Sequence, residues 1–511
     1  MRVVSVDEMR AIEQRAGTEY GLTTDVLMRS AGRSIAEILR ARLGGDVVNT
    51  SILILVGPGN NGGDGRVAAG HLAEWGAHIT SFIWKERRLE DGASVLSVGD
   101  DLRAVKESLA HADVVLDALL GTGHARALDP SMRNVLAAVG EERARRPALL
   151  VVSVDLPTGL DADSGAVDPG TLAADLTVTL AFPKRGMLLF PGASYIGELE
   201  VGDIGLPADM PIDVTLDLMT PEIVRGLLPA RPLDSNKGTF GKAMIMAGSM
   251  PYPGSAFLAA TAAGRVGAGL VTLAVTPDLA PIYAVKLSET TFLPLPDASG
   301  SPVDRARALL DGLHGYAALL IGPGLGQADD TRAFLMALFD GLRTMPASSR
   351  PRLVVDADGL NNLARAERWW ELLPPHTVIT PHPGEMTRLR GGSHVSGGGA
   401  DRLDVVRWAA EWGHVIVLKG GCTLVASPDG RMRINWPPNP ALATAGTGDV
   451  LAGAVVGFLA QGANPFDAAS SAVFTHARAG LAVSDRLGDA GLLASDLLPE
   501  LPSALRDTRT A

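Results

Sequence analysis

The sequence predicts a two-domain protein in which each domain is an α/β structure built around a parallel sheet. Three observations lead to this fold class: short apolar runs alternate with helical patterns, a proline-rich break lies near residue 220, and the chain has 511 residues. One hydrophobic core rarely continues to grow over that length. Apolar strands that alternate with helices are typical of parallel sheets covered by helices on both faces.

The first half begins with a helical pattern from Met9 to Arg42, which predicts one or two surface helices. Short apolar runs that we interpret as strands follow it. The first of them ends in glycine and is followed by a helical pattern from Val67 to Trp75. The predicted strands of this half are residues 51–56, 114–116, 149–154 and 176–180.

A proline-rich stretch between residues 205 and 232 interrupts any regular element and is the best candidate for a domain boundary. Its prolines are Pro207, Pro211, Pro221, Pro229 and Pro232. Beyond it the alternation resumes, with predicted strands at residues 243–247, 319–321, 353–355, 377–379 and 415–418. We therefore expect one domain over residues 1–220 and a second over residues 221–511.

Composition excludes several classes of function. A formal net charge of −12 argues against a surface that holds nucleic acid or an anionic membrane. The single cysteine, Cys422, excludes an internal disulfide and a multi-cysteine zinc site, and we expect it to be a buried apolar residue. The chain start lacks the apolar core of a signal peptide, and the most apolar stretch, residues 450–460, falls short of the roughly 20 residues that span a bilayer. A cytoplasmic location is the expectation.

The firmest chemical motif is a run of small residues from Asn439 to Asp449, directly before an apolar helical pattern. Backbone amides at the start of a helix attract phosphate groups, and the helix dipole strengthens this attraction. Asp449 at that edge could accept a proton from a hydroxyl group while the amides neutralise a transferring phosphoryl group. The alternative is a glycine-rich turn in which Asp449 only caps the helix.

Four further motifs of the second half lie at predicted strand ends, where open α/β sheets bind their ligands. A lysine there could reach a nucleotide phosphate, a glycine loop permits close approach of a ligand, and two prolines fix the direction of a histidine and a glutamate. The motifs are Lys419 in the run 418–423, the loop Gly322–Gly326, Asp356 and Asp358, and His382 and Glu385 in the run 380–385.

Together these motifs resemble the ADP-dependent NAD(P)H-hydrate dehydratases, which are ribokinase-like proteins, over residues 225–500. The runs 236–238 and 252–256 add to the resemblance, although Asn236 stands where the family usually has histidine and Ala445 replaces a common glycine. The resemblance implies that ADP, with Mg²⁺, donates its β-phosphoryl group to the ring hydroxyl that Asp449 deprotonates. It implies hydrate contacts from Ala256, Gly324, His382 and Asp449, and ADP or AMP contacts from Lys419, Gly420, Gly421, Cys422, Thr423 and Gly448.

The first half contains a glycine motif, Gly57 to Gly62, after a predicted strand. This spacing alone is weak evidence for a dinucleotide site, because the acidic residue expected at the end of the next strand is not clear. The turn continues to Asp64 and suits a small polar ligand or a cation as well as a pyrophosphate. Asp117 and Asp155 end two further strands on the same edge, and three polar turns there predict a pocket.

These motifs resemble the NAD(P)H-hydrate epimerases over residues 5–205, which implies a Rossmann-like three-layer α/β/α domain. The resemblance implies potassium ligands from Asn61, Asp117 and Thr158, and acid–base work by Asp155. An epimerase interconverts the R and S hydrates so that a stereospecific dehydratase can use both. The implied hydrate contacts are Asn60, Asn61, Gly62, Gly63, Asp64, Gly121, Thr122, Gly123, His124, Ala125, Arg126, Ala127 and Asp155.

Two other interpretations stay open at the level of the sequence. A ribokinase-like kinase of a small alcohol would explain Asp449 but not the fused first domain. The first domain could also be a non-catalytic binding module, although Asn60, Asp117 and Asp155 are intact. The expected partners are small molecules, hydrated NADH or NADPH and ADP, and family analogy suggests a homo-oligomer. The preference between ADP and ATP is not determined by these motifs.

Overall fold

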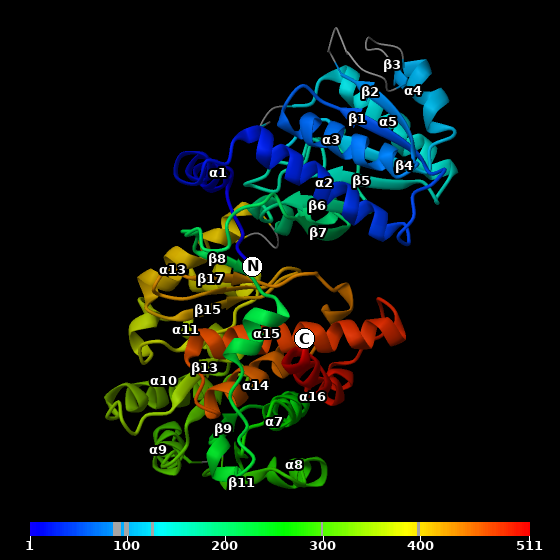
Figure 1. The fold of residues 1–511 in the computed structure, drawn as a ribbon. Helices are drawn as coiled ribbons and strands as arrows, with labels where there is room; N and C mark the ends of the chain where they lie inside the picture. The colour runs from blue at the N-terminus through cyan, green and yellow to red at the C-terminus, as the bar shows by residue number, and fades with distance from the viewer. Residues whose placement is uncertain (85–93, 97–101, 124–126, 298–299, 396–398) are drawn as a thin grey trace. The chain divides into compact units, whose positions relative to one another are not determined.

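A computed structural model describes residues 1–84, 94–96, 102–123, 127–297, 300–395 and 399–511 of the chain (Figure 1). The chain divides into two compact units. The first holds residues 2–214, and the second holds Met1 and most of residues 215–511. No helix in the described ranges combines the length and apolarity needed to cross a membrane.

The first unit is built on a seven-stranded, fully parallel sheet with strand order β3-β2-β1-β4-β5-β6-β7. The order reverses at β1, so the loops after β1 and β4 leave the sheet side by side at its carboxyl edge. The strands are β1 (Ser51–Val56), β2 (His78–Ile83), β3 (Ser94–Leu96), β4 (Val114–Ala118), β5 (Leu150–Val154), β6 (Leu176–Leu180) and β7 (Glu198–Gly202).

Helices cover both faces of this sheet, which confirms the predicted three-layer arrangement. Alternate residues of β1 show why: Ile52 and Ile54 pack into one apolar core, and Leu53 packs into the other. Successive side chains of a strand point to opposite faces, so a strand that is apolar throughout needs a helical layer on each side. One face carries α1 (Val6–Tyr20), α2 (Thr24–Arg42) and α3 (Asn60–Glu74), and the other carries α4 (Leu102–Leu109) and α5 (Pro130–Arg145).

The second unit contains a ten-stranded sheet with strand order β11-β10-β9-β12-β13-β14-β15-β16-β17-β8. Strands β9 to β15 pair in parallel, whereas β16 runs antiparallel to both of its neighbours. The strands are β8 (Leu216–Leu218), β9 (Lys242–Met246), β10 (Leu270–Val275), β11 (Thr291–Pro294), β12 (Ala318–Ile321), β13 (Arg352–Val355), β14 (Val378–Ile379), β15 (Val415–Leu418), β16 (Leu424–Ala426) and β17 (Met432–Ile434).

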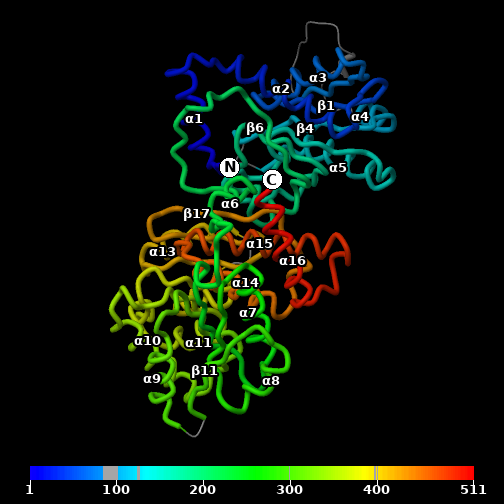
Figure 2. The backbone as a smooth tube through the Cα atoms, turned by 60° about the horizontal axis from the view of Figure 1, so that its bottom comes forward, coloured from blue at the N-terminus to red at the C-terminus, as the bar shows by residue number. Residues whose placement is uncertain are grey.

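The helices of the second unit also form two layers around its sheet, and Figure 2 shows α14 beside α7 and α15 in one of them. The largest apolar core of the unit lies under that layer. This helix layer consists of α6 (Pro221–Leu227), α7 (Pro253–Arg265), α8 (Ala280–Lys286), α14 (Thr447–Ala460), α15 (Pro465–Leu487) and α16 (Ala494–Thr510). The other face carries α9 (Pro302–Gly312), α10 (Asp329–Thr344), α11 (Asp358–Leu363), α12 (Pro383–Leu389) and α13 (Val405–Trp412).

The structure corrects two expectations about local structure. The proline-rich stretch is not free of regular elements, because it contains β8 and α6. Pro221 occupies the first turn of α6, where a missing N–H costs nothing, and Thr220 caps the helix. The polar turn expected over Asn60–Asp64 is instead the beginning of α3.

The glycines in the first turns of α3 reflect close packing. A Cβ atom at Gly62 would lie 2.0 Å from the carbonyl oxygen of Gly57, and one at Gly65 would lie 2.6 Å from the Cβ of Ala118. Glycine therefore lets α3 begin directly against β1 and β4, which places Asn60, Asn61 and Asp64 at the carboxyl edge of the sheet.

We predict that Gly453→Ala destabilises the second unit. A Cβ at Gly453 in α14 would lie 2.3 Å from the carbonyl oxygen of Ala259 in α7, so the two helices must separate. Overpacking of this kind costs about 1–3 kcal/mol, and calorimetry should show a lower thermal midpoint. Gly264→Ala is the matched control, because Gly264 is exposed in α7 with open space around it, and alanine should leave the midpoint unchanged or raise it. Equal midpoints for the two variants would contradict this packing.

Candidate active sites

Asp449 lies in the first turn of α14, which begins at Thr447 after Gly446 in a left-handed conformation (φ 90°). The first amides of a helix have no carbonyl partner inside it, so those of Gly448 and Asp449 point out from the helix start. The side chain of an N-cap residue, which precedes the helix, would accept hydrogen bonds from these amides. Asp449 instead lies within the first turn, and the N-cap position is Gly446. This position favours the anion-binding interpretation over the capping alternative.

The Asp449 carboxylate has a partner that sequence reasoning missed. Ser255, near the start of α7, forms a hydrogen bond with it. Burial raises the pKa of Asp449 to about 6; the Ser255 bond and Lys419 lower it, and the charge of Asp356 raises it further. The group is therefore ionised at neutral pH and still basic enough to take a proton.

Lys419 follows β15 and forms a buried ion pair. Its Nζ lies 2.8 Å from Asp356 Oδ1 and 3.8 Å from Glu385 Oε2. Burial works against the charged ammonium, but the carboxylates of Asp356 and Glu385 outweigh it, so the pKa of Lys419 is raised. A Cβ at Gly448 would lie 3.5 Å from this nitrogen. The lysine thus stands between the carboxyl pair and the start of α14.

His382 caps α12 and has a defined tautomer. Its Nδ1 accepts hydrogen bonds from the amides of Gly384 (3.0 Å) and Glu385 (3.3 Å), and Glu385 Oε2 accepts from the His382 amide in return. Because Nδ1 is an acceptor, the ring proton is on Nε2. The His382 side chain is half exposed. Burial, with Lys419 and Arg388 nearby, lowers the pKa of His382, so the imidazole is neutral at pH 7.

The two aspartates after β13 have different partners. Asp356 pairs with Lys419, whereas Asp358 accepts from the amide of Gly326 (2.8 Å) and from the side chain of Gln327 (3.1 Å). Asp358 therefore fixes the loop Gly322–Gly326. Gly324 in that loop has φ 66°, and a Cβ there would lie 2.8 Å from Ser255 Oγ. This close approach brings Gly324 to Ser255 and hence to Asp449.

Ala256 and the loop Lys419–Thr423 complete the predicted residues of this unit. Ala256 is fully buried in α7, next to Ser255. Arg402, which the sequence did not single out, is 2% exposed and donates to the carbonyls of Leu418, Lys419 and Cys422, so it fixes the loop that contains Gly420 and Gly421. The Cys422 thiol is buried and burial raises its pKa to about 12, which confirms the apolar assignment.

In the first unit, Asp155 follows β5 with φ 66° and pairs with Lys184, whose side chain is 1% exposed. Asp155 Oδ1 also accepts from the amide of Leu180 (3.1 Å) and from Thr179 Oγ1 (3.4 Å). Lys184 donates in addition to Thr179 Oγ1 (3.1 Å) and to the carbonyl of Leu180 (3.0 Å). Three donors on one oxygen hold the Asp155 carboxylate as an acceptor in a fixed orientation.

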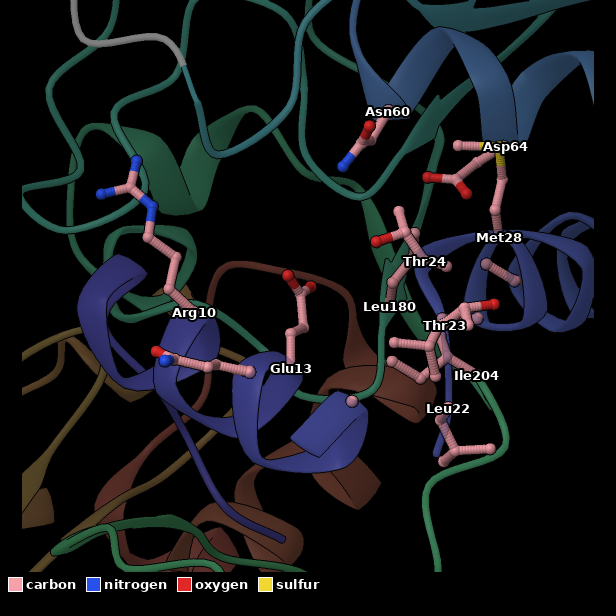
Figure 3. A pocket seen from close by; sticks show the side chains of 14 residues that line it. Arg10, Glu13, Leu22, Thr23, Thr24, Met28, Asn60, Asp64, Leu180 and Ile204 are labelled. Carbon is pink, nitrogen blue, oxygen red and sulfur yellow. The ribbon is translucent and has the colours of Figure 1, made fainter. Parts of the chain in front are cut away.

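A pocket of about 530 Å³ lies between α1, α2 and the start of α3, and Figure 3 shows its lining. Asn60 and Asp64 enter it from α3, and Glu13 enters it from α1. Burial raises the pKa of Asp64 to about 8, with further contributions from the charges of Asp155 and Glu13, which Lys184 partly offsets. Asp64 is thus largely protonated at neutral pH.

Asn61, Asp117 and Thr158 are all buried. Thr158 Oγ1 lies 2.7 Å from Asp117 Oδ1, and its amide donates to Asp117 Oδ2 (3.0 Å). Burial raises the pKa of Asp117, although these bonds oppose the shift. The side-chain oxygen and nitrogen of Asn61 are both buried without a hydrogen-bond partner. Across the described residues, no three His, Cys, Asp or Glu side chains form a metal-binding group.

The loop after β4 is only partly described. Gly121 lies against Asn61, since a Cβ there would lie 3.2 Å from Asn61 Oδ1. Thr122 is partly buried, and Gly123 and Ala127 are exposed. His124, Ala125 and Arg126, which were also predicted to contact a hydrate, lie outside the described residues.

Sequence reasoning missed four residues of these sites: Glu13, Lys184, Ser255 and Arg402. Ser255 stood within a recognised motif. Nothing in the local sequence marks the other three, because Glu13 lies in a surface-helix pattern, and Lys184 and Arg402 meet their partners only through the tertiary fold.

Two family models match the chain, one in each of its two units. Residues 243–503 match the family described as NAD(P)H-hydrate dehydratase, and residues 24–186 match the family described as YjeF-related protein N-terminus. A crystal structure of the ADP/ATP-dependent NAD(P)H-hydrate dehydratase from Bacillus subtilis, co-crystallised with ATP and Mg²⁺, is 30% identical and covers 57% of this chain and 98% of its own, with a TM-score of 0.48.

Full-length relatives cover both units. The bifunctional NAD(P)H-hydrate repair enzyme Nnr of Moorella thermoacetica is 38% identical over 99% of this chain and 97% of its own length. The enzyme of the same name from Thermofilum pendens is 36% identical over 100% of this chain and 97% of its own. With matches of this identity over both units, the chain belongs to the family of bifunctional NAD(P)H-hydrate repair enzymes.

Proposed function

We propose that this chain repairs hydrated NADH and NADPH by two successive reactions. The first exchanges the R and S hydrates, and the second dehydrates the S hydrate with ADP, releasing AMP and phosphate. The observation that carries the proposal is Asp449, a basic carboxylate at the phosphate-binding start of α14, in a chain whose first unit holds a second polar pocket.

The dehydration follows from the geometry around Asp449. Asp449 takes the proton of the ring hydroxyl as the β-phosphoryl group of ADP moves to that oxygen, and the amides of α14 and the ammonium of Lys419 neutralise the phosphoryl charge. The phosphate then leaves with the C–O bond electrons, and loss of a ring proton restores the reduced nicotinamide. His382, neutral with its proton on Nε2, is placed to donate a hydrogen bond to the hydrate.

The nucleotide would lie along the loop Lys419–Thr423 and Gly448, and Mg²⁺ would accompany it. Mg²⁺ bound to phosphates needs only one or two protein carboxylates. Asp356 and Glu385, buried beside Lys419, carry more negative charge than the lysine neutralises, so these residues fit a divalent cation and would hold it. When bound, the ion would neutralise phosphate charge.

For the epimerisation we propose a site formed by Asn60–Asp64, Gly121–Ala127 and Asp155, with Asp155 as a catalytic carboxylate. Asn61, Asp117 and Thr158 would hold a potassium ion, because all three are buried and the side-chain oxygen of Asn61 has no hydrogen-bond partner. Its charge would hold the start of α3 against the loop after β4.

The wider proposals follow the same family assignment. We assign the epimerase to residues 1–220 and the dehydratase to residues 221–511, and we propose action in the cytoplasm as a homo-oligomer. A small-alcohol kinase would need the same phosphoryl chemistry, but the full-length relatives favour the repair reactions.

Substitutions in the two units should separate the reactions. Asp449→Asn keeps shape but removes the base, so dehydration should fall about 10²–10⁴-fold while epimer exchange continues. Asp155→Asn should slow epimer exchange while dehydration of the S hydrate continues. Asparagine tolerates the left-handed backbone at this position. Absorbance of the reduced nicotinamide reports dehydration, and chromatography of the hydrates reports exchange. Normal dehydration by Asp449→Asn would remove Asp449 as the base.

Dehydration should depend on pH through Asp449. The base must be ionised, and its pKa is raised to about 6, so kcat/KM with the S hydrate should be flat above that pH. Below it, kcat/KM should fall about tenfold per pH unit. The residual activity of Asp449→Asn should lack this limb. A profile without the limb in the wild-type protein would show that another group is the base.

Potassium should stabilise the first unit through Asn61. Replacing choline chloride by KCl at equal ionic strength should raise the thermal midpoint, because binding adds up to about 2.7 kcal/mol to the free energy of unfolding at a hundredfold excess over Kd. Asn61→Leu should lose this response, and without K⁺ it should cost little, because it removes two buried polar atoms that lack partners. Equal responses of both proteins to KCl would place the ion elsewhere or nowhere.

A further inference from the structure

The first helix of the chain is anchored beside the Asp155–Lys184 pair. The Val4 amide donates to the carbonyl of Pro183 (2.9 Å), and the Arg185 amide donates to the carbonyl of Val4 (3.0 Å). Glu8, in the first turn of α1, accepts from the Arg185 guanidinium at 2.7 and 2.8 Å. These contacts flank Lys184 on both sides, so they fix α1 relative to the residues around Asp155.

This anchoring brings Glu13 to the wall of the pocket that lies across from Asp64. Figure 3 shows Glu13 pointing into the pocket from α1, whereas Asp64 enters from α3. Glu13 is exposed to solvent, whereas Asp64 is 7% exposed. No motif of the family resemblance includes Glu13.

The surroundings of the two carboxyl groups raise the pKa of both. Burial raises the pKa of Glu13, and Lys184 and Arg10 oppose the effect while Asp155 adds to it. The pKa of Asp64 is raised by burial and by both other carboxylates. Lys184 is already bonded to Asp155, which leaves Arg10 as the other cation named near the pair of carboxyl groups.

Epimer exchange needs proton transfer on both faces of the ring. The R and S hydrates differ at the carbon that carries the hydroxyl, so the C–O bond must break on one face and form again on the other. Departure of the hydroxyl requires a proton donor on its face, and addition of water requires an acceptor on the opposite face. In the reverse reaction the two roles exchange.

We propose that Glu13 and Asp64 are the paired proton donor and acceptor of the epimerase, acting from opposite walls of the pocket. This inference rests on the proposed epimerase function. One carboxylic acid gives its proton to the departing hydroxyl, which leaves as water and takes the C–O electron pair. The charge of Asp155, which acts on both carboxyl groups, stabilises the cationic ring that remains. A water molecule adds from the other face and gives a proton to the second carboxylate, so no net oxidation, reduction or charge change occurs.

The test follows label and configuration together in the full-length protein. Each pure hydrate epimer is incubated in H₂¹⁸O, and mass spectrometry with chiral separation measures ¹⁸O uptake and inversion. Wild-type protein should couple the two, with uptake accompanied by inversion. Glu13→Gln should lower inversion at least about 100-fold. It should retain ¹⁸O uptake without inversion for one epimer only, because Asp64 still serves one face. Asp64→Asn should show the opposite preference.

Glu19→Gln is the matched control, because Glu19 is also an exposed glutamate of α1 but does not line the pocket, so the variant should match the wild-type protein. Glu13→Asp should recover part of the inversion. Inversion by Glu13→Gln at the wild-type rate would overturn the carboxyl pair while leaving the epimerase function in place. Failure of the wild-type protein to invert either hydrate would overturn both.

Discussion

In the second unit the ammonium of Lys419 lies 2.8 Å from the carboxylate of Asp356, which is 1% exposed. The two residues end strands on either side of β14, so parallel pairing of β13, β14 and β15 brings them to one edge. A buried charge of this kind persists only with a partner, and breaking the pair leaves an uncompensated charge at a cost of about 3–5 kcal/mol. Glu385, Asp449 and, through Glu385, His382 are arranged around this pair. The site therefore depends on strand register as much as on any single side chain.

The first unit uses the same arrangement with different residues. Lys184 and Asp155 form a buried pair at the carboxyl edge of a parallel sheet, and carboxyl groups with raised pKa values lie near it. In each unit we propose that the ion pair supplies fixed charge and that a neighbouring carboxyl group moves the proton: Asp449, with a pKa of about 6, and Asp64, with a pKa of about 8. Because the ion pair and the proton-transferring carboxyl group are different residues, the pair can stay charged while the carboxyl group gains and loses its proton.

The sequence was enough to predict the α/β class, most central strands and the residues at their carboxyl ends, because buried parallel strands are continuous apolar runs and their polar ends stand out. It was not enough for the short strands at one end of the second sheet, such as β16 and β17, whose pairing is set by neighbours in space. It also failed at Asn60–Asp64, where glycines that suggest a turn instead allow α3 to pack against β1. Lys184 and Glu13 carry no local signal, since each acquires its role from a segment more than 25 residues away, as the 29-residue separation of Lys184 and Asp155 illustrates.

The central claim is that one chain returns both epimers to the reduced cofactor at the expense of ADP. The most direct measurement gives wild-type protein an equal mixture of R and S hydrates with excess ADP and Mg²⁺, and counts reduced nicotinamide, AMP and phosphate. Both epimers should be consumed completely, with one AMP and one phosphate for each reduced cofactor recovered. Recovery without AMP, or consumption that stops when the S epimer is exhausted, would contradict it.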